Sequence, residues 1–198
     1  MTKIIKVDLY SVGDYAKHLK NLEPEDKYSR FGTNMSDSSI DNIILQMVYH
    51  TNEHELWVAV DGKQNVQGWG HMAKDGSSWE LACSVEKKAQ RKGVGNQLIQ
   101  EMLEWAKVHN IDEVYMHCIE NNKAIQHLAQ KNNLSTRERG YGERVAAIEL
   151  SDPSFFEKNS QLLKEYVRLV DDMTELRLRI VSLMFGNTDT SHKEKKYV

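Results

Sequence analysis

A basic, glycine-spaced turn is the first part of the sequence whose residue types could do chemistry. Residues 90–95 read Gln-Arg-Lys-Gly-Val-Gly, and an amphipathic segment follows at once. The first N–H groups of a helix have no intrahelical partners, the positive end of its dipole attracts anions, and glycines let a ligand approach the backbone. Arg91 and Lys92 add positive charge. The turn is typical of a pyrophosphate site, and an ordinary basic turn with glycines for geometry alone is the competing interpretation.

Two well-known nucleotide-binding patterns do not fit this turn. A Walker loop needs a lysine after its second glycine and then Ser or Thr. Here Lys92 precedes Gly93, and neither Ser nor Thr follows. A dinucleotide fingerprint needs a third glycine three residues after Gly95, where Leu98 stands. These residues exclude both patterns.

The segments around the turn predict a mixture of strands and helices. Ser36 or Asp37 is placed to cap one helix, and Leu98, Met102 and Trp105 form the apolar face of another. The order of the elements predicts an α/β (α+β) domain, in which a mixed sheet is flanked by helices. Strand-like runs occupy residues 3–10, 55–62, 66–73, 77–85, 112–119 and 143–150, and helix-like runs occupy residues 13–22, 36–50, 96–110 and 121–133.

The C-terminal quarter has a different period. After Asp152-Pro153, apolar residues recur at alternating spacings of 4 and 3, which predicts one long amphipathic helix. This helix either packs against its own domain or forms a homodimer. We therefore divide the chain into a domain at 1–152, a heptad-patterned helix at 153–185 and a flexible tail at 186–198. The heptad positions are Leu162, Tyr166, Leu169, Met173, Leu176, Ile180 and Leu183.

Two blocks of the sequence resemble the GNAT superfamily of N-acetyltransferases. The block "SVEKKAQRKGVGNQLIQEMLEWA" resembles its acetyl-coenzyme A binding segment and matches the pattern at Gln90, Gly93 and Gly95. The block "ENNKAIQHLAQKNNL" resembles the next one, with Asn122 at the asparagine position and Asn133-Leu134 where Gly-Phe is usual. Within the superfamily, the chain looks most like the acetyltransferase domains of bacterial protein-lysine acetyltransferases.

This resemblance implies a fold, a co-substrate and a reaction. The fold would be a mostly antiparallel central sheet flanked by helices. The co-substrate would be acetyl-coenzyme A, whose acetyl group passes directly to a primary amine, either a small molecule or a protein lysine, in a ternary complex. The residues expected to bind acetyl-coenzyme A are Val85, Gln90, Arg91, Lys92, Gly93, Val94, Gly95, Asn96 and Asn122.

The catalytic groups are less well specified. Glu80 stands where several relatives carry a general base that takes the proton of the amine, and an outward-facing strand residue is its alternative interpretation. Many relatives use a tyrosine to protonate the leaving thiolate, but this chain has Ala129 there. Tyr141, Tyr115 and solvent remain as candidates for the general acid. The cysteines, Cys83 and Cys118, are interpreted as reduced core residues and not as nucleophiles.

Composition excludes several other classes of protein. The 198 residues carry a net charge of −3, which gives no general attraction to nucleic acid. No apolar run reaches the roughly 18 residues of a membrane span, and no signal peptide is evident, so we expect a cytoplasmic protein that binds neither membranes nor nucleic acid. Neither cysteine has the spacing of a zinc site, and no metal is expected.

Two other functions remain open from the sequence. One is an acyl-coenzyme A binding or sensing module with little turnover, whose C-terminal helix transmits the signal. It is favoured by Ala129 and by Asn133-Leu134, which both depart from the GNAT pattern. The other is a coiled-coil adaptor, which would explain residues 154–185 and nothing before them.

Overall fold

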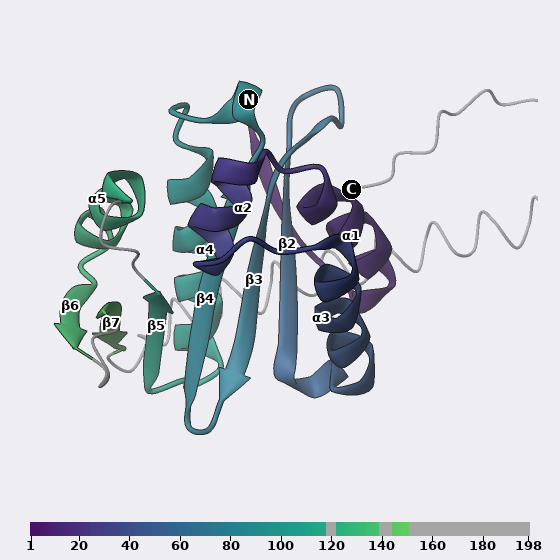
Figure 1. The fold of residues 1–198 in the computed structure, drawn as a ribbon. Helices are drawn as coiled ribbons and strands as arrows, with labels where there is room; N and C mark the ends of the chain where they lie inside the picture. Colours follow the sequence, from purple (N-terminus) through teal and green to yellow (C-terminus); the bar gives the residue numbers. More distant parts are fainter. Residues whose placement is uncertain (118–121, 139–143, 151–198) are drawn as a thin grey trace, which may run out of the picture.

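A seven-stranded sheet is the centre of the protein in the computed structural model, which describes residues 1–117, 122–138 and 144–150 (Figure 1). Its order is β1-β2-β3-β4-β5-β7-β6. All neighbours are antiparallel except β4 and β5, which are parallel. This confirms the predicted mixed, mostly antiparallel sheet. The strands are β1 (Lys3–Val7), β2 (His54–Val60), β3 (Val66–Asp75), β4 (Ser78–Val85), β5 (Glu113–His117), β6 (Ser135–Glu138) and β7 (Arg144–Glu149).

Helices cover both faces of the sheet. Figure 1 shows α1 and α3 beside each other at the β2 end, and α2 in front of β4 with α4 behind it. Short 3-10 turns, η1 to η3, connect some of these elements. The helices are α1 (Val12–Lys20), α2 (Pro24–Phe31), α3 (Asp37–Tyr49), α4 (Val94–Val108) and α5 (Lys123–Lys131), and the 3-10 turns are η1 (Leu9–Ser11), η2 (Thr51–Glu53) and η3 (Lys87–Ala89).

Two of these elements were not among the predicted helices and strands. Helix α2 begins with Pro24 at its first position, has two acidic residues in its first turn and ends at Gly32, whose φ of 71° is left-handed. These are ordinary start and stop signals that could have identified it. Strand β6 is only four residues long and pairs with β7, so its own sequence carries little periodicity.

The α4 face of the sheet is apolar. Leu98 and Met102 on α4 have no exposed surface, and Trp105 is buried among Trp57 and Trp79. This confirms the predicted apolar stripe of the helix at 96–110. At Gly70 on β3 a Cβ atom would lie 2.9 Å from the Met102 sulfur, so a larger residue there would displace the Met102 side chain.

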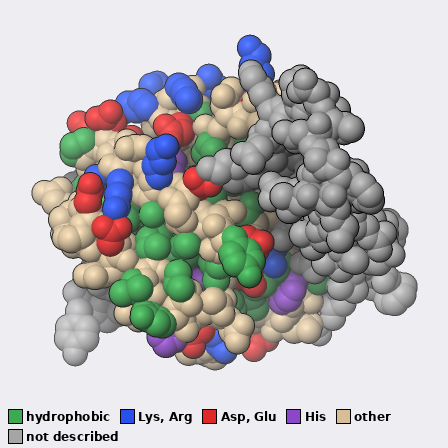
Figure 2. Space-filling view, turned by 90° about the vertical axis from the view of Figure 1, so that its right-hand side faces the viewer, with side chains coloured by type: hydrophobic (Ala, Val, Ile, Leu, Met, Phe, Trp, Pro, Cys, Tyr) green, Lys and Arg blue, Asp and Glu red, His purple; other side chains and the backbone are tan. Residues whose placement is uncertain are grey.

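The other face has an apolar part and a polar part. Beneath α1 and α3, Ile40 and Met47 are fully buried with Leu56, and Ser36 caps α3 by accepting the Ser39 N–H. Nearer β4, the buried side chains of this face include polar groups, and His71 is among them. Figure 2 views the molecule from the α1 and α3 side and shows hydrophobic side chains gathered there.

The predicted heptad helix at 153–185 and the tail at 186–198 lie outside the described residues. In the part of the chain that the structure describes, no helix combines the length and the apolar character needed to cross a bilayer.

Candidate functional site

The sheet opens between β4 and β5. These strands pair only at Trp79 with Val114 and at Glu80 with Tyr115. Beyond this fork, residues 81–85 of β4 have no register partner among the described residues of β5. The last part of β4 therefore has one edge that the sheet does not occupy.

Backbone groups of β4 point towards this open edge. The Glu86 N–H donates to the Gln67 C=O at 2.8 Å, on the β3 side, and alternate residues of an antiparallel strand point the opposite way. The N–H and C=O groups of Cys83 and Val85 are thus directed to the edge that faces away from β3. The Val85 C=O accepts a hydrogen bond from Gln90 Nε2 there, at 3.2 Å.

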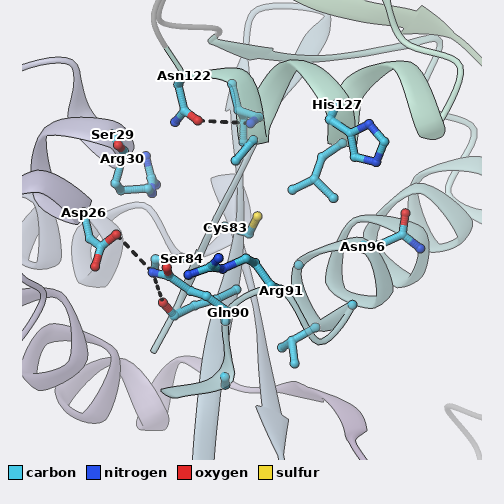
Figure 3. Close-up of a pocket in the computed structure, with 18 of the residues that line it drawn as sticks. Asp26, Ser29, Arg30, Cys83, Ser84, Gln90, Arg91, Asn96, Asn122 and His127 are labelled. Carbon is cyan, nitrogen blue, oxygen red and sulfur yellow. Dashed lines mark hydrogen bonds between the residues drawn. The ribbon is translucent and has the colours of Figure 1, made fainter. Parts of the chain in front are cut away.

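A cavity of about 580 Å³ lies at the open edge. Its walls come from the end of β4, the 90–95 turn, the first turn of α4, and helices α2 and α5. Figure 3 shows Asp26, Ser29 and Arg30 on one side of this cavity, and Asn96 and His127 on the other. Its volume is within the range of about 300–1,000 Å³ that is typical of small-molecule sites.

The turn at 90–95 has the backbone shape of an anion site. Gly93 is the residue before α4 and has a φ of 84°, and Arg91 also has a positive φ, of 59°. No acidic residue stands in the first turn of α4, so its dipole is not offset there. A Cβ atom on Gly95 would lie 3.4 Å from Leu128 Cδ1, which shows how closely α5 approaches this turn.

Most of the residues predicted to bind the co-substrate line this cavity, and one does not. The lining residues among them are Val85, Gln90, Arg91, Gly93, Val94, Gly95, Asn96 and Asn122. Lys92 is the exception, because its ammonium donates to the Lys88 C=O at 2.7 Å, on the exposed side of the turn. Of the two adjacent cations of the turn, Arg91 therefore lines the cavity and Lys92 does not.

Three of the lining residues also make hydrogen bonds that support the site. Gln90 Nε2 donates to Asp26 Oδ1 at 3.0 Å and so ties α2 to the turn. Asn96 Oδ1 accepts from Asn132 Nδ2 at 3.1 Å, which joins α4 to the end of α5. Asn122 caps α5, where its side chain accepts the Ile125 N–H.

Cys83 lines the cavity, but its chemistry is that of a buried thiol. Burial raises its pKa to about 11, although the nearby Arg30 guanidinium acts to lower it. The thiol is therefore protonated near neutral pH, which agrees with its interpretation as a core residue. Cys118 lies outside the described residues.

The proposed catalytic residues are placed at the fork of β4 and β5. Glu80 is half-buried there, on the α1 and α2 side, and does not itself line the cavity. Tyr115 is opposite Glu80 in the register, and its hydroxyl donates to Asp75 Oδ2 at 2.7 Å. Tyr141 lies outside the described residues.

Arg30 connects the fork to the cavity, because it lines the cavity and interacts electrostatically with Glu80. Its Nη2 donates a long hydrogen bond of 3.5 Å to the Tyr15 hydroxyl, and its buried Nε has no hydrogen-bond partner among the described residues. Burial acts to lower the pKa of Arg30, but Tyr15 and Glu80 together raise it, so the guanidinium stays charged.

The polar face of the sheet holds two buried histidines, His71 and His18, and the half-buried His54. His71 Nε2 lies 3.1 Å from His54 Nδ1, and burial, with the Arg30 charge, holds the pKa of His71 well below its usual range. His18 on α1 lies between Ser84 and Glu86, with its Nε2 2.8 Å from Ser84 Oγ and its Nδ1 2.9 Å from Glu86 Oε1. These contacts join residues that are far apart in sequence, so no local pattern indicates them.

The α2 wall of the cavity was not predicted from the sequence. Asp26 and Ser29 line the cavity from this helix together with Arg30. The capping signals of α2 would have identified the helix, but nothing in its sequence shows that it packs over β4.

Comparison with known proteins decides the family. Residues 16–133 match the model of the acetyltransferase (GNAT) family, which is more than half of the chain. The chain belongs to the GNAT family. The match includes the glycine turn, the fork of β4 and β5, and helix α5.

Solved structures of GNAT proteins share the fold. The spermidine N-acetyltransferase from Vibrio cholerae, in complex with CoA and spermine, has a TM-score of 0.60 and 16% identity, over 76% of this chain and 96% of that one. The PaiA N-acetyltransferase from Thermoplasma acidophilum, in complex with coenzyme A, has a TM-score of 0.58 and 12% identity, over 76% of this chain and 99% of that one. An N-acetyltransferase from Staphylococcus aureus Mu50 has a TM-score of 0.57 and 15% identity, over 76% and 99% of the two chains.

No curated protein matches this chain in sequence. With identities of 12–16%, the solved structures establish the GNAT fold, and the family match establishes the general kind of reaction.

Proposed function

We propose that this protein is an acetyl-coenzyme A-dependent N-acetyltransferase that acts on a primary amine. The observation that carries the proposal is the cavity at the open edge of β4, with the glycine turn and the first turn of α4 in its wall. The first N–H groups of α4 are donors for a pyrophosphate. The N–H and C=O groups on the open edge of β4 are partners for the amides of an extended chain. Two of the similar structures were solved with coenzyme A or CoA bound, which agrees with this use of the fold.

The residues of the turn fit the anionic part of such a co-substrate. Gly93 and Gly95 have no side chain to cover the first N–H groups of α4, and Arg91 brings a positive charge to the cavity wall. The peptide-like part would follow the open edge of β4, where the Cys83 and Val85 N–H groups are donors for its amides and for the thioester carbonyl. Binding in this direction puts the thioester beside the last residues of β4, between the turn and the fork.

The transfer itself requires a proton to be removed from the amine. A lysine-like ammonium has a pKa near 10.4, so forming the neutral amine at pH 7 costs about 4–5 kcal/mol. In the proposal Glu80 accepts this proton, directly or through water, because it is the carboxylate at the fork. The amine nitrogen then attacks the thioester carbon and the C–S bond breaks, with no acetylated enzyme residue on this route.

The general acid for the leaving thiolate has no assigned residue in the proposal. Tyr115 donates its hydroxyl hydrogen to Asp75, and Tyr141 stays a prediction from the sequence. A protein lysine as acceptor, a homodimer formed through residues 153–185 and a cytoplasmic location also stay predictions. The spermidine N-acetyltransferase with spermine bound is one reason to include polyamines among the amines to be tested.

Isothermal titration of the full chain with acetyl-coenzyme A tests the proposal. Arg91 lines the cavity and Lys92 does not, so the two charge reversals form a matched pair. We expect Arg91→Glu to weaken binding about 10- to 100-fold, the loss typical of one hydrogen bond between charged groups. Lys92→Glu should weaken it less, because an exposed charge further from the ligand is screened by salt.

Two results would contradict the proposal. The first is an absence of binding by the unmodified chain at near-millimolar acetyl-coenzyme A. The second is an equal loss of affinity in both variants, which would mean that the cavity wall has no special part in binding.

A second candidate function is an acyl-coenzyme A binding module with little turnover. It is favoured by Ala129, which is buried on α5 where many relatives carry a tyrosine, and by the engagement of Tyr115 with Asp75. A free-thiol release assay over polyamines, amino acids, aminoglycosides and lysine peptides separates the two. Binding without thiol release from any acceptor would favour the module.

A further inference from the structure

Three polar residues on the α1 side of β4 form a chain of hydrogen bonds that ends at the cavity. Ser84 Oγ lies 2.8 Å from His18 Nε2, and His18 Nδ1 lies 2.9 Å from Glu86 Oε1. Ser84 is one of the residues that line the cavity, and its side chain and the His18 ring are buried. This is the spatial order of a nucleophile, a base and the carboxylate that orients the base.

The backbone explains why these side chains meet. Successive side chains of a strand alternate between its faces, so Ser84 and Glu86, two residues apart, both face α1. His18 is in the last turn of α1, which packs against the sheet at this point. His18 and Ser84 are thus held by two regular elements, and Glu86 directly follows β4 as the residue before η3.

The hydrogen bonds also fix the state of the histidine ring. A carboxylate can only accept, so His18 Nδ1 carries the hydrogen that is donated to Glu86. His18 Nε2 is then the free acceptor and receives the Ser84 hydroxyl hydrogen. Burial lowers the pKa of His18 although Glu86 acts to raise it, which favours the neutral ring that a general base requires.

A donor for a developing oxyanion is next to the serine. In many serine hydrolases the N–H of the residue after the nucleophile stabilises the tetrahedral intermediate. Here that residue is Val85, whose N–H is directed to the open edge of β4 and away from the β3 hydrogen bonds. The cavity therefore has a hydroxyl and a suitable backbone donor on adjacent residues.

We propose that Ser84, His18 and Glu86 are a nucleophilic triad that hydrolyses acyl-coenzyme A thioesters in the absence of an amine. This rests on the proposed function only in that the acyl-coenzyme A binds in the same cavity. It is a second activity, because transfer to an amine by direct attack needs no acylated residue.

The reaction has two balanced steps. In the first, Ser84 Oγ bonds to the thioester carbonyl carbon while His18 Nε2 takes its proton. The C–S bond breaks, the thiolate leaves with the proton from His18, and Ser84 carries the acyl ester. In the second, His18 takes a proton from water as the water attacks the ester carbon, the bond between that carbon and Ser84 Oγ breaks, and Ser84 Oγ recovers its hydrogen from His18. The products are a carboxylate, a proton and free coenzyme A.

The experiment incubates the full chain with acetyl-coenzyme A and no amine. Thiol release is followed with a colorimetric reagent, and acid-quenched samples are digested and analysed by mass spectrometry for an acetyl group. We expect slow thiol release and an acetyl ester on Ser84. Ser84→Ala should remove the release above background, and His18→Gln should reduce it about 100- to 10,000-fold, the range typical of loss of a general base.

Two further variants separate a catalytic role from a structural one. Ser78→Ala changes another serine of β4, which bonds to Glu113 and does not line the cavity, and it should leave thiol release unchanged. Ser84→Cys keeps a nucleophile at the same position and should still become acetylated. Each variant is titrated with acetyl-coenzyme A, and we expect the affinity of Ser84→Ala to match that of the unmodified chain.

The outcomes are distinct for the two proposals. If acetyl-coenzyme A does not bind the unmodified chain, the proposed transferase function fails. If it binds but Ser84→Ala releases thiol as fast as the unmodified chain, only the triad is overturned. An acetyl group found on Cys83 and not on Ser84, or a loss of release in Ser84→Ala that matches a loss of affinity, would overturn the triad as well.

Discussion

The two faces of β4 differ in chemistry although they belong to one strand. Trp79, Leu81 and Cys83 face α4 and join an apolar core. Glu80 and Ser84 face α1 and α2, where buried arginine and histidine side chains lie. The difference indicates that the two faces have separate roles. The apolar face packs the strand against α4, and the polar face carries the side chains able to transfer protons.

We expect the largest effect from a substitution on the polar face, and we expect it in the catalytic activity. Glu80→Gln keeps the shape of the side chain and removes its ability to accept a proton. If Glu80 is the general base, turnover with an amine should fall about 100- to 10,000-fold while the affinity for acetyl-coenzyme A is retained. Thiol release and isothermal titration on the same sample measure the two quantities. Unchanged turnover would mean that Glu80 is an ordinary strand residue and not the general base.

We expect the next largest effect from a substitution on the apolar face, and we expect it in the free energy of unfolding. Leu98 on α4 has no exposed surface, and its side chain packs in the core between this helix and the sheet. Leu98→Ala removes buried methyl groups and leaves a cavity, so the free energy of unfolding should fall by about 2–5 kcal/mol. Urea denaturation followed by circular dichroism measures this loss. A loss below about 0.5 kcal/mol, the usual size for a surface substitution, would mean that this face is not the tightly packed one.

We expect a smaller effect of pH on the free energy of unfolding, and we expect it to come from the polar face. Burial holds the folded-state pKa of His71 below its unfolded value, so its contribution to stability is present above about pH 6.5 and is lost as the pH falls. The free energy of unfolding should decrease below pH 6.5, by at most about 1.4 kcal/mol per pH unit for this residue. His71→Gln should make that slope shallower.

The measurement is urea denaturation at several pH values between 8 and 5. Between pH 8 and pH 7 both states hold this histidine mostly neutral, so this interval serves as the internal reference. The same slope below pH 6.5 in His71→Gln and in the unmodified chain would show that the polar face does not titrate through this residue.

The sequence predicted the apolar face of the molecule better than the polar one. The stripe that contains Leu98, Met102 and Trp105 repeats with the period of a helix, and Ser36 is a local cap, so both features can be read from nearby residues. Helix α2 was missed although Pro24 marked its start. The glycine turn could be recognised because its pattern lies in consecutive residues.

The polar site depends on contacts across the chain. Ser84 and His18 are 66 residues apart, and Gln90 and Asp26 are 64 apart. The sequence contains no periodicity that would join such pairs. The sequence likewise did not show that Arg91 lines the cavity while its neighbour Lys92 bonds to the Lys88 C=O outside the lining.

Local sequence patterns are enough to specify the order of most elements, the apolar face of α4 and the turn at 90–95, because each depends on residues within one or two helical turns or a single strand. Three features appear only in the folded chain: β4 and β5 part beyond Glu80, α2 forms a wall of the cavity, and His18 connects Ser84 to Glu86. Burial and hydrogen bonding between distant segments depend on how the helices pack on the sheet, and local residue patterns do not encode that packing.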